Sequence, residues 1–138
     1  MPGPNPPATL QDPQPGPQAS PQPGANGREA PPRPPAIHPT AIVHPDATIG
    51  DGASIGPYCI VEAGASIGEG TVLDGHAWVY ERSAIGRDCR LFPGAVVGTP
   101  PQDLSYRGEP TRAVVGDGVR IHEYATVHRA SGEGNETV

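Results

Sequence analysis

Histidine is the side chain best suited to acid–base chemistry and metal binding near neutral pH, and this sequence contains five. Four of them, His38, His44, His122 and His128, directly follow an aliphatic residue. If those aliphatic residues face a core from β-strands, the histidines that follow them point outward. We interpret His38 and His44 as solvated side chains. His128 follows a polar segment and is a candidate to line a cleft, although a solvated imidazole is the simpler interpretation of any single histidine.

The polar segment before His128 reads TPPQDLSYRGEPTRAV, residues 99–114. It interrupts a regular aliphatic pattern and cannot fill a core by that pattern. We therefore expect residues 98–114 to form a loop that leaves the folded scaffold. Loops on a rigid scaffold commonly carry function, and the alternative is a tolerated insertion without a role.

A six-residue repeat must position these side chains. A small residue stands four positions after each of the first ten aliphatic residues: Ala41, Ala47, Ala53, Cys59, Ala65, Thr71, Ala77, Ser83, Cys89 and Ala95. The aliphatic series itself recurs at every sixth position: Ile37, Val43, Ile49, Ile55, Val61, Ile67, Leu73, Val79, Ile85, Leu91 and Val97.

A period of six fits neither a helix, which repeats at about 3.6 residues, nor a simple strand, which repeats at about 2. It fits a short strand plus a tight corner, so three repeat units would close one triangular coil. Stacked coils would pair through parallel strands, and the sequence predicts an all-β parallel β-helix of about five coils. Val115 follows Val97 by three repeat units, the length of one coil, and restarts the series. We therefore expect the helix to resume in register after the loop.

The spacing of the remaining reactive side chains gives little support to a metal site. No two histidines are separated by three repeat units, so none should stack on a neighbouring coil. A zinc site within one subunit is therefore poorly supported, whereas a site shared between subunits stays open. Cys59 and Cys89 both occupy the small position of the repeat, and we interpret them as buried small side chains.

Composition divides the chain into two parts. Residues 1–36 contain 13 of the 20 prolines, which predicts a disordered, partly polyproline-like tail before the repeat domain at 37–138. The net charge is −6 and every cation is arginine, so nucleic-acid binding is not expected. The chain contains neither a signal-peptide pattern nor an apolar run of about 20 residues, and we expect a cytoplasmic protein without a membrane span.

Two segments of the sequence are similar to one enzyme family. The loop QDLSYRGEPTR is followed by TVHRAS, and the repeat opens with IHPTAIVHPDATIGDGASIGPYCIVEAGASIGEGTVL. Over residues 37–138 the chain resembles the UDP-N-acetylglucosamine O-acyltransferases of lipid A biosynthesis. The hexapeptide pattern alone is shared by many acyltransferases and by gamma-type carbonic anhydrases, and the loop is the more specific feature.

The resemblance implies a left-handed parallel β-helix and a homotrimer with active sites between subunits. It implies transfer of a 3-hydroxyacyl group from acyl carrier protein to the 3-hydroxyl of UDP-N-acetylglucosamine, the first step of lipid A biosynthesis. A histidine general base and a backbone N–H for the oxyanion would suffice, without metal or cofactor. By position, Gln102 and Asp103 match residues that contact the nucleotide sugar, and His128 matches a histidine that lines the same cleft.

The sequence departs from the family in two places. Ser105 stands where the family usually has lysine, so Arg107 or Arg112 would have to supply a cation. The family's catalytic histidine stands in a segment like N/Y-x-H-x-A-H-D/N-C, more than a coil beyond the position of His128, and Val138 comes ten residues after that histidine. We therefore expect no catalytic residue within this chain, with the general base beyond Val138, and no turnover by this piece alone.

Two other functions remain open from the sequence. A gamma-type carbonic anhydrase would need three histidine ligands, for which His76, His122 and His128 are the nominees, although nothing specific pairs them. A non-catalytic β-helical scaffold or interaction module with a Pro-rich tail is the third interpretation.

Overall fold

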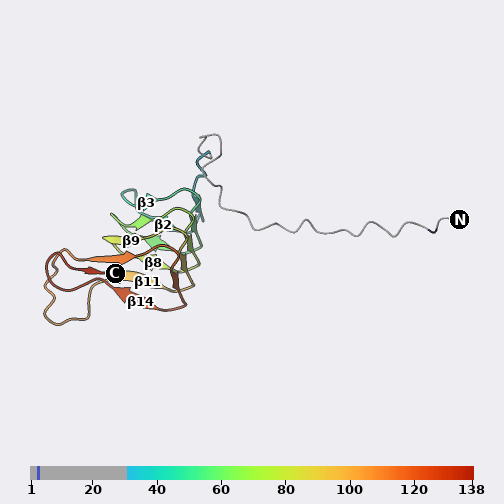
Figure 1. Ribbon diagram of the computed structural model, residues 1–138. Coiled ribbons are helices and arrows are strands. Elements are labelled where there is room, and N and C mark those ends of the chain that lie inside the picture. The colour runs from blue at the N-terminus through green and yellow to red at the C-terminus, as the bar shows by residue number, and fades with distance from the viewer. Residues whose placement is uncertain (1–2, 4–30) are drawn as a thin grey trace, which may run out of the picture. The chain divides into compact units, whose positions relative to one another are not determined.

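The computed structural model describes residue 3 and residues 31–138 of the chain. The predicted Pro-rich tail, residues 1–36, lies largely outside the described residues. The described part consists of strands, turns and loops, and it contains no helix that is long and apolar enough to cross a membrane (Figure 1).

Fifteen short strands build the repeat domain. Their bounds are β1 Ala36–Ile37, β2 Ile42–Val43, β3 Thr48–Ile49, β4 Ser54–Ile55, β5 Ile60–Val61, β6 Ser66–Ile67, β7 Val72–Leu73, β8 Trp78–Val79, β9 Ser83–Ile85, β10 Arg90–Leu91, β11 Val96–Thr99, β12 Arg112–Val115, β13 Arg120–Ile121, β14 Thr126–His128 and β15 Glu136–Thr137.

The strands form three parallel sheets of five strands each. The first sheet has the order β1-β4-β7-β10-β13, the second β2-β5-β8-β11-β14 and the third β3-β6-β9-β12-β15. Since each sheet takes every third strand, three consecutive strands make one coil and five coils stack. Figure 1 shows this stack, with successive coils lying one beside the next. The parallel β-helix of about five coils predicted from the repeat is therefore confirmed.

The aliphatic series fills the interior of the stack. In the first sheet Ile55 pairs with Leu73, Leu73 with Leu91 and Leu91 with Ile121, so these side chains lie on top of one another. The small position is buried as well, because a narrow prism has no room for larger side chains there. Cys59 is part of this set and is a free thiol, as is Cys89. Both cysteines are buried, which confirms their predicted place in the core.

The loop between β11 and β12 lengthens the sequence separation between neighbouring coils without changing the phase of the repeat. Val127 pairs with Val97 on the neighbouring coil. The two residues are five repeat units apart in the sequence, whereas residues paired on adjacent coils before the loop are three units apart. Val115 lies over Ile85 in the third sheet. The prediction that a loop leaves the stack here and that the coil then resumes in register is therefore confirmed. One repeat unit of that segment continues the stack, and the length of the other two forms the loop.

The looped-out segment is shorter than the predicted range of 98–114. β11 extends to Thr99 and β12 begins at Arg112, so the excursion loop comprises residues 100–111. The end residues of the predicted range belong to strands because they pair with neighbouring coils, Ala113 with Ser83 and Thr99 with His128.

Candidate functional site

The stem of the excursion loop is shaped by a break in the pairing of β11 with β14. Val97 pairs with Val127, but the next pair is Thr99 with His128, so β11 has one extra residue at Gly98. The φ of Gly98 is 92°, a conformation that residues with a side chain rarely adopt. This bulge places Thr99 beside His128 at the edge from which the loop departs.

The imidazole of His128 is half-buried and held by the loop stem. Its Nδ1 lies 2.8 Å from the Thr99 hydroxyl oxygen and 3.1 Å from the Pro100 carbonyl oxygen. A carbonyl oxygen can only accept, so we assign the proton to Nδ1, which donates to Pro100. In the tautomer with the proton on Nδ1, Nε2 is unprotonated and can accept a hydrogen bond. His128 is thus more constrained than the solvated imidazole that was its simpler interpretation.

Asp103 is the centre of the hydrogen bonds within the excursion loop. The backbone N–H and the hydroxyl of Ser105 donate to Asp103 Oδ1 at 2.8 Å and 2.7 Å. The Tyr106 N–H donates to the Asp103 carbonyl oxygen at 3.0 Å. Hydrogen bonds from the Ser105 backbone, the Ser105 hydroxyl and the Ser131 hydroxyl lower the pKa of Asp103 below its ordinary value. The carboxylate is therefore ionised near neutral pH and fixed as an acceptor.

Gln102 is exposed and directly precedes Asp103 in the same loop. Within residues 31–138, neither of these side chains hydrogen-bonds to His128. Pro100, two residues before Gln102, is held on the His128 ring, and Asp103 accepts a hydrogen bond from Ser131, three residues after His128. The loop that carries Gln102 and Asp103 is thus attached to the segment that carries His128.

Several residues of this region were missed from the sequence. The guanidinium of Arg129 is buried, with Nη1 lying 3.3 Å from Glu81 Oε1 and Cζ lying 5.9 Å from the centre of the Tyr106 ring. Thr99 was also missed. The number of residues between Thr99 and His128 differs from that between paired residues on adjacent coils elsewhere in the stack. The pairing of Thr99 with His128 can be predicted only once the length of the loop is known.

The histidines proposed as metal ligands lie in different surroundings. His76 stacks on Tyr58 with ring centres 5.2 Å apart, and His122 stacks on Phe92 with ring centres 4.6 Å apart. The structure therefore does not bring these two histidines to His128. In the part of the chain that the structure describes, no group of three His, Cys, Asp or Glu side chains could hold a metal ion.

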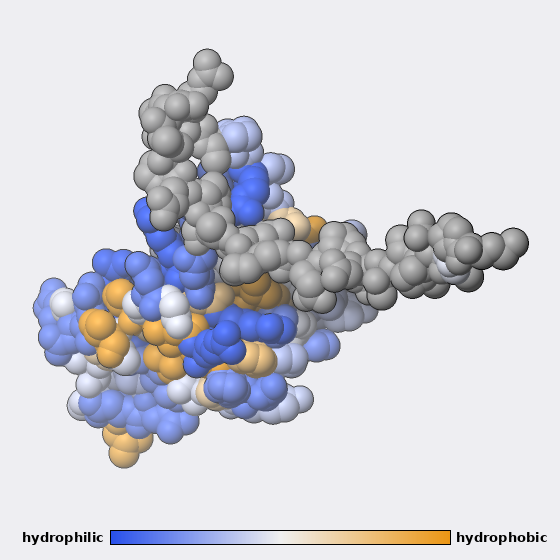
Figure 2. All heavy atoms as spheres, turned by 45° about the vertical axis from the view of Figure 1, so that its right-hand side comes forward, coloured by the Kyte–Doolittle hydropathy of each residue, from blue (hydrophilic) through white to orange (hydrophobic). Residues whose placement is uncertain are grey.

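The outward face of the second sheet is the most apolar of the three faces. Its outward side chains include Ile42, Ile60, Trp78 and Val96, whereas those of the first sheet include Ser54, Arg90 and Arg120. A groove of about 420 Å³ lies along β2 and β5, at one edge of this face, and is lined by apolar residues together with His44, Glu62 and Glu81. Figure 2 shows hydrophobic residues gathered in patches between hydrophilic ones on one side of the molecule.

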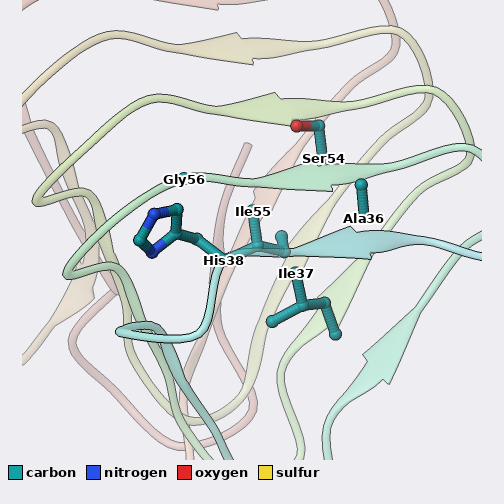
Figure 3. Close-up of a pocket in the computed structure, with 6 residues that line it drawn as sticks. All are labelled: Ala36, Ile37, His38, Ser54, Ile55 and Gly56. Carbon is teal, nitrogen blue, oxygen red and sulfur yellow. The ribbon is translucent and has the colours of Figure 1, made fainter.

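A second hollow, of about 370 Å³, lies over β1 and β4 (Figure 3). His38 lines it, and the Nδ1 of this ring accepts a hydrogen bond from the backbone N–H of Thr40 at 3.2 Å. The ring therefore caps its own turn. The other lining residues are Ala36, Ile37, Ser54, Ile55 and Gly56, none of which is ionisable, so this hollow offers no partner for acid–base chemistry.

The described domain consists of stacked triangular coils with a loop that leaves the stack beside the half-buried His128. This arrangement defines the class of the protein. It is a hexapeptide-repeat protein with a left-handed parallel β-helix. Residues 33–132 match the family model described as the GMPPB C-terminal domain, and the chain belongs to this family.

Individual relatives are O-acyltransferases. The chain is 46% identical over 99 residues to the acyl-[acyl-carrier-protein]–UDP-N-acetylglucosamine O-acyltransferase of Thermodesulfovibrio yellowstonii, and the match covers 72% of this chain and 38% of the relative. The UDP-N-acetylglucosamine acyltransferase structure from Francisella novicida superposes with a TM-score of 0.71 at 37% identity, covering 74% of this chain and 38% of that one. The Bacteroides fragilis structure gives a TM-score of 0.70 at 36% identity, covering 72% and 39%.

These similarities confirm the resemblance inferred from the loop and the opening repeats. They also confirm the left-handed helix that the resemblance implied. The chain spans less than two fifths of the length of the curated relatives that it matches, 38% and 36%.

Proposed function

We propose that this chain contributes the first coils and the nucleotide-sugar loop of a UDP-N-acetylglucosamine O-acyltransferase. The reaction moves a 3-hydroxyacyl group from acyl carrier protein to the 3-hydroxyl of UDP-N-acetylglucosamine, at the start of lipid A biosynthesis. The observation that carries this proposal is the 46% identity to such an enzyme over 99 residues. With these substrates the reaction belongs in the cytoplasm.

In this proposal, Gln102, Asp103 and His128 bind the nucleotide sugar. The amide of Gln102 can both donate and accept, which suits the edges of a uracil ring. The ionised carboxylate of Asp103 accepts hydrogen bonds from sugar hydroxyls, and the donors from Ser105 keep it in that state. Nε2 of His128 accepts a further hydrogen bond, since Nδ1 is occupied by the loop stem.

The pyrophosphate of the substrate is an anion and favours a nearby cation. In this chain Ser105 stands where the family usually has lysine, so another residue has to supply that cation. Arg112 Nη1 lies 3.3 Å from Glu136 Oε1 and is engaged in this ion pair. Arg107 donates through Nη1 to the Leu104 carbonyl oxygen at 2.9 Å, and it is carried by the loop itself. We therefore favour Arg107 as the replacement.

The acyl transfer needs no metal and no covalent intermediate on the enzyme. A histidine general base takes the proton of the sugar 3-hydroxyl, whose oxygen attacks the thioester carbonyl while a backbone N–H stabilises the oxyanion. The C–S bond then breaks, and the thiolate of the acyl carrier protein leaves with the proton that the histidine took up. The resemblance assigns this base to a segment that these 138 residues do not contain. The residues of this chain bind and orient the acceptor.

A homotrimer is the assembly that we propose. The apolar outward side chains of the second sheet, Ile42, Ile60, Trp78 and Val96, support the packing of a second copy on this face. A thin prism also has a large surface for its volume, so association adds burial that one chain cannot reach alone.

Calorimetric titration of UDP-N-acetylglucosamine into the 138-residue chain tests the proposal. We expect saturable binding that UDP-glucose, which lacks the acetamido group, reproduces more weakly. Gln102→Ala and Asp103→Asn should each weaken binding roughly tenfold, since a lost hydrogen bond leaves its partner unpaired. Asp51→Asn, in an exposed turn between β3 and β4, is the matched control and should bind like the wild type. No binding by the wild-type chain would overturn the proposal in favour of the scaffold interpretation.

A further inference from the structure

Arg129 is a buried cation beside the candidate site. Its residue surface is 7% exposed, whereas Arg90 and Arg112 have side chains that are 50% and 53% exposed. Removing a guanidinium from water is costly unless other groups compensate for the lost hydration. Arg129 directly follows His128 at the end of β14, and this position in the strand does not by itself explain why its side chain is buried. The partners of Arg129 must therefore explain it.

The partners of Arg129 come from the scaffold on one side and from the excursion loop on the other. On the scaffold side, Nη1 donates to Glu81 Oε1 at 3.3 Å, and the backbone N–H donates to the Thr99 carbonyl oxygen at 2.9 Å. On the loop side, the guanidinium faces the Tyr106 ring at 5.9 Å, within the range of a cation–π contact. Arg129 thus bridges the loop and the stack.

Tyr106 transmits this contact to the candidate binding residues. Its backbone N–H donates to the Asp103 carbonyl oxygen at 3.0 Å, and its hydroxyl donates to the Glu109 carbonyl oxygen at 3.0 Å. The position of the ring is therefore linked to the turn from Asp103 to Tyr106 and to the part of the loop around Glu109. Fixing the ring fixes the turn that carries the Asp103 carboxylate.

We propose that Arg129 is a positioning residue that holds the excursion loop in its binding conformation through Tyr106. In this role it acts by ordering the residues that bind the proposed substrate. The inference about loop order stands on the structure alone. Its consequence for substrate affinity rests on the proposed function.

Hydrogen exchange in the loop measures this role directly. The backbone N–H groups of Ser105, Tyr106 and Arg107 are all hydrogen-bonded within the loop, so their exchange reports its order. We expect Arg129→Met to accelerate exchange of these three amides about tenfold, as loss of a partly buried cation–π and ion-pair contact implies. Amides of β4, β7 and β10 should keep their wild-type rates. Arg129→Lys keeps the charge but loses the planar group, and we expect an intermediate effect.

Arg90→Met is the matched control. Arg90 makes the same two kinds of contact on another face, an ion pair with Asp74 at 3.1 Å and a cation–π contact with Phe92 at 4.8 Å. Its loss should leave exchange in the loop unchanged. The proposal is overturned if Arg129→Met is folded and its loop amides exchange within about twofold of the wild-type rate.

Tyr106→Ala keeps the proposal testable if Arg129→Met does not fold, since Tyr106 lies in the loop and not in the core. It should accelerate exchange as strongly as Arg129→Met, and the double variant should add little to either. An unchanged exchange rate in Tyr106→Ala would equally overturn the proposal. UDP-N-acetylglucosamine affinity is measured on the same variants. If the wild type does not bind this ligand, the proposed function fails while the exchange result still decides the role of Arg129.

Discussion

The Nδ1 atom of His128 lies 2.8 Å from the hydroxyl oxygen of Thr99, although 29 residues separate them in the chain. The contact exists because the excursion loop is inserted without disturbing the stack, and because one extra residue in β11 turns Thr99 toward β14. The same bulge directs Pro100 to the imidazole. One histidine thereby closes the stem of the loop and still offers its second nitrogen to a ligand.

The two nitrogens of His128 can be separated by substitution. Asparagine places an N–H near the position of Nδ1 and nothing near Nε2, so His128→Asn should keep the stem contact to Pro100. We expect this variant to lose roughly tenfold in affinity for UDP-N-acetylglucosamine, with unchanged hydrogen exchange in the loop. His128→Gln reaches the position of Nε2 but not that of Nδ1, so it should loosen the loop. Calorimetry and hydrogen exchange check both, and identical behaviour of the two variants would contradict the assignment.

The lowered pKa of Asp103 predicts how the loop responds to acid. The pKa of Asp103 is lower in the folded state than its ordinary value of about 3.9. Ionised Asp103 therefore stabilises the folded loop fully above that value. This stabilisation is lost as the pH falls through the lower folded pKa. The loop should therefore be insensitive to pH between 7 and about 4 as far as Asp103 is concerned. A carboxyl-carbon NMR titration should show Asp103 titrating below an ordinary aspartate. Ser105→Ala should raise this pKa toward its usual value, and an unchanged pKa in that variant would show that the Ser105 hydroxyl does not cause the shift.

Two leucines provide a test of the core. Leu91 is 0% exposed in the centre of the stack, and Leu104 is 95% exposed in the excursion loop. Leu91→Ala should lower the free energy of unfolding by about 2–5 kcal/mol, because it removes buried methyl groups and leaves a cavity. Leu104→Ala is the control and should change it by less than about 0.5 kcal/mol. Denaturant unfolding measures both, and similar losses would be inconsistent with this packing.

Burial predicts slow chemistry at both cysteines. Desolvation is the main cause that raises the pKa of the Cys59 thiol, so its reactive thiolate is scarce at neutral pH. Cys89 is 2% exposed, and reagents cannot reach it in the folded chain. We expect a thiol reagent such as dithionitrobenzoate to label both residues slowly in the native protein and rapidly in denaturant. Fast labelling of the native protein would show that the coils open.

The sequence alone was sufficient to predict the β-helix, because the same six-residue pattern recurs along most of the domain. A single aliphatic position that recurs from Ile37 to Val97 leaves few ways to bury those side chains, and one strand per unit follows from the period. The segment containing Gln102 and Asp103 was also recognisable as a loop, since it breaks this period. The loop sequence and the opening repeats carried the resemblance to the acyltransferases, which the relatives confirm.

The register beyond the loop and the contacts that depend on it required the tertiary structure. The interval from Val97 to Val115 equals one coil in length, but in the structure Val115 lies over Ile85. The sequence does not show which residues of that interval belong to the loop and which to the coil. The pairing of His128 with Thr99 and the bridge from Arg129 to Glu81 follow from that register. Repeat spacing alone determined which residues face the core. The three-dimensional course of one loop decided which side chains meet outside it.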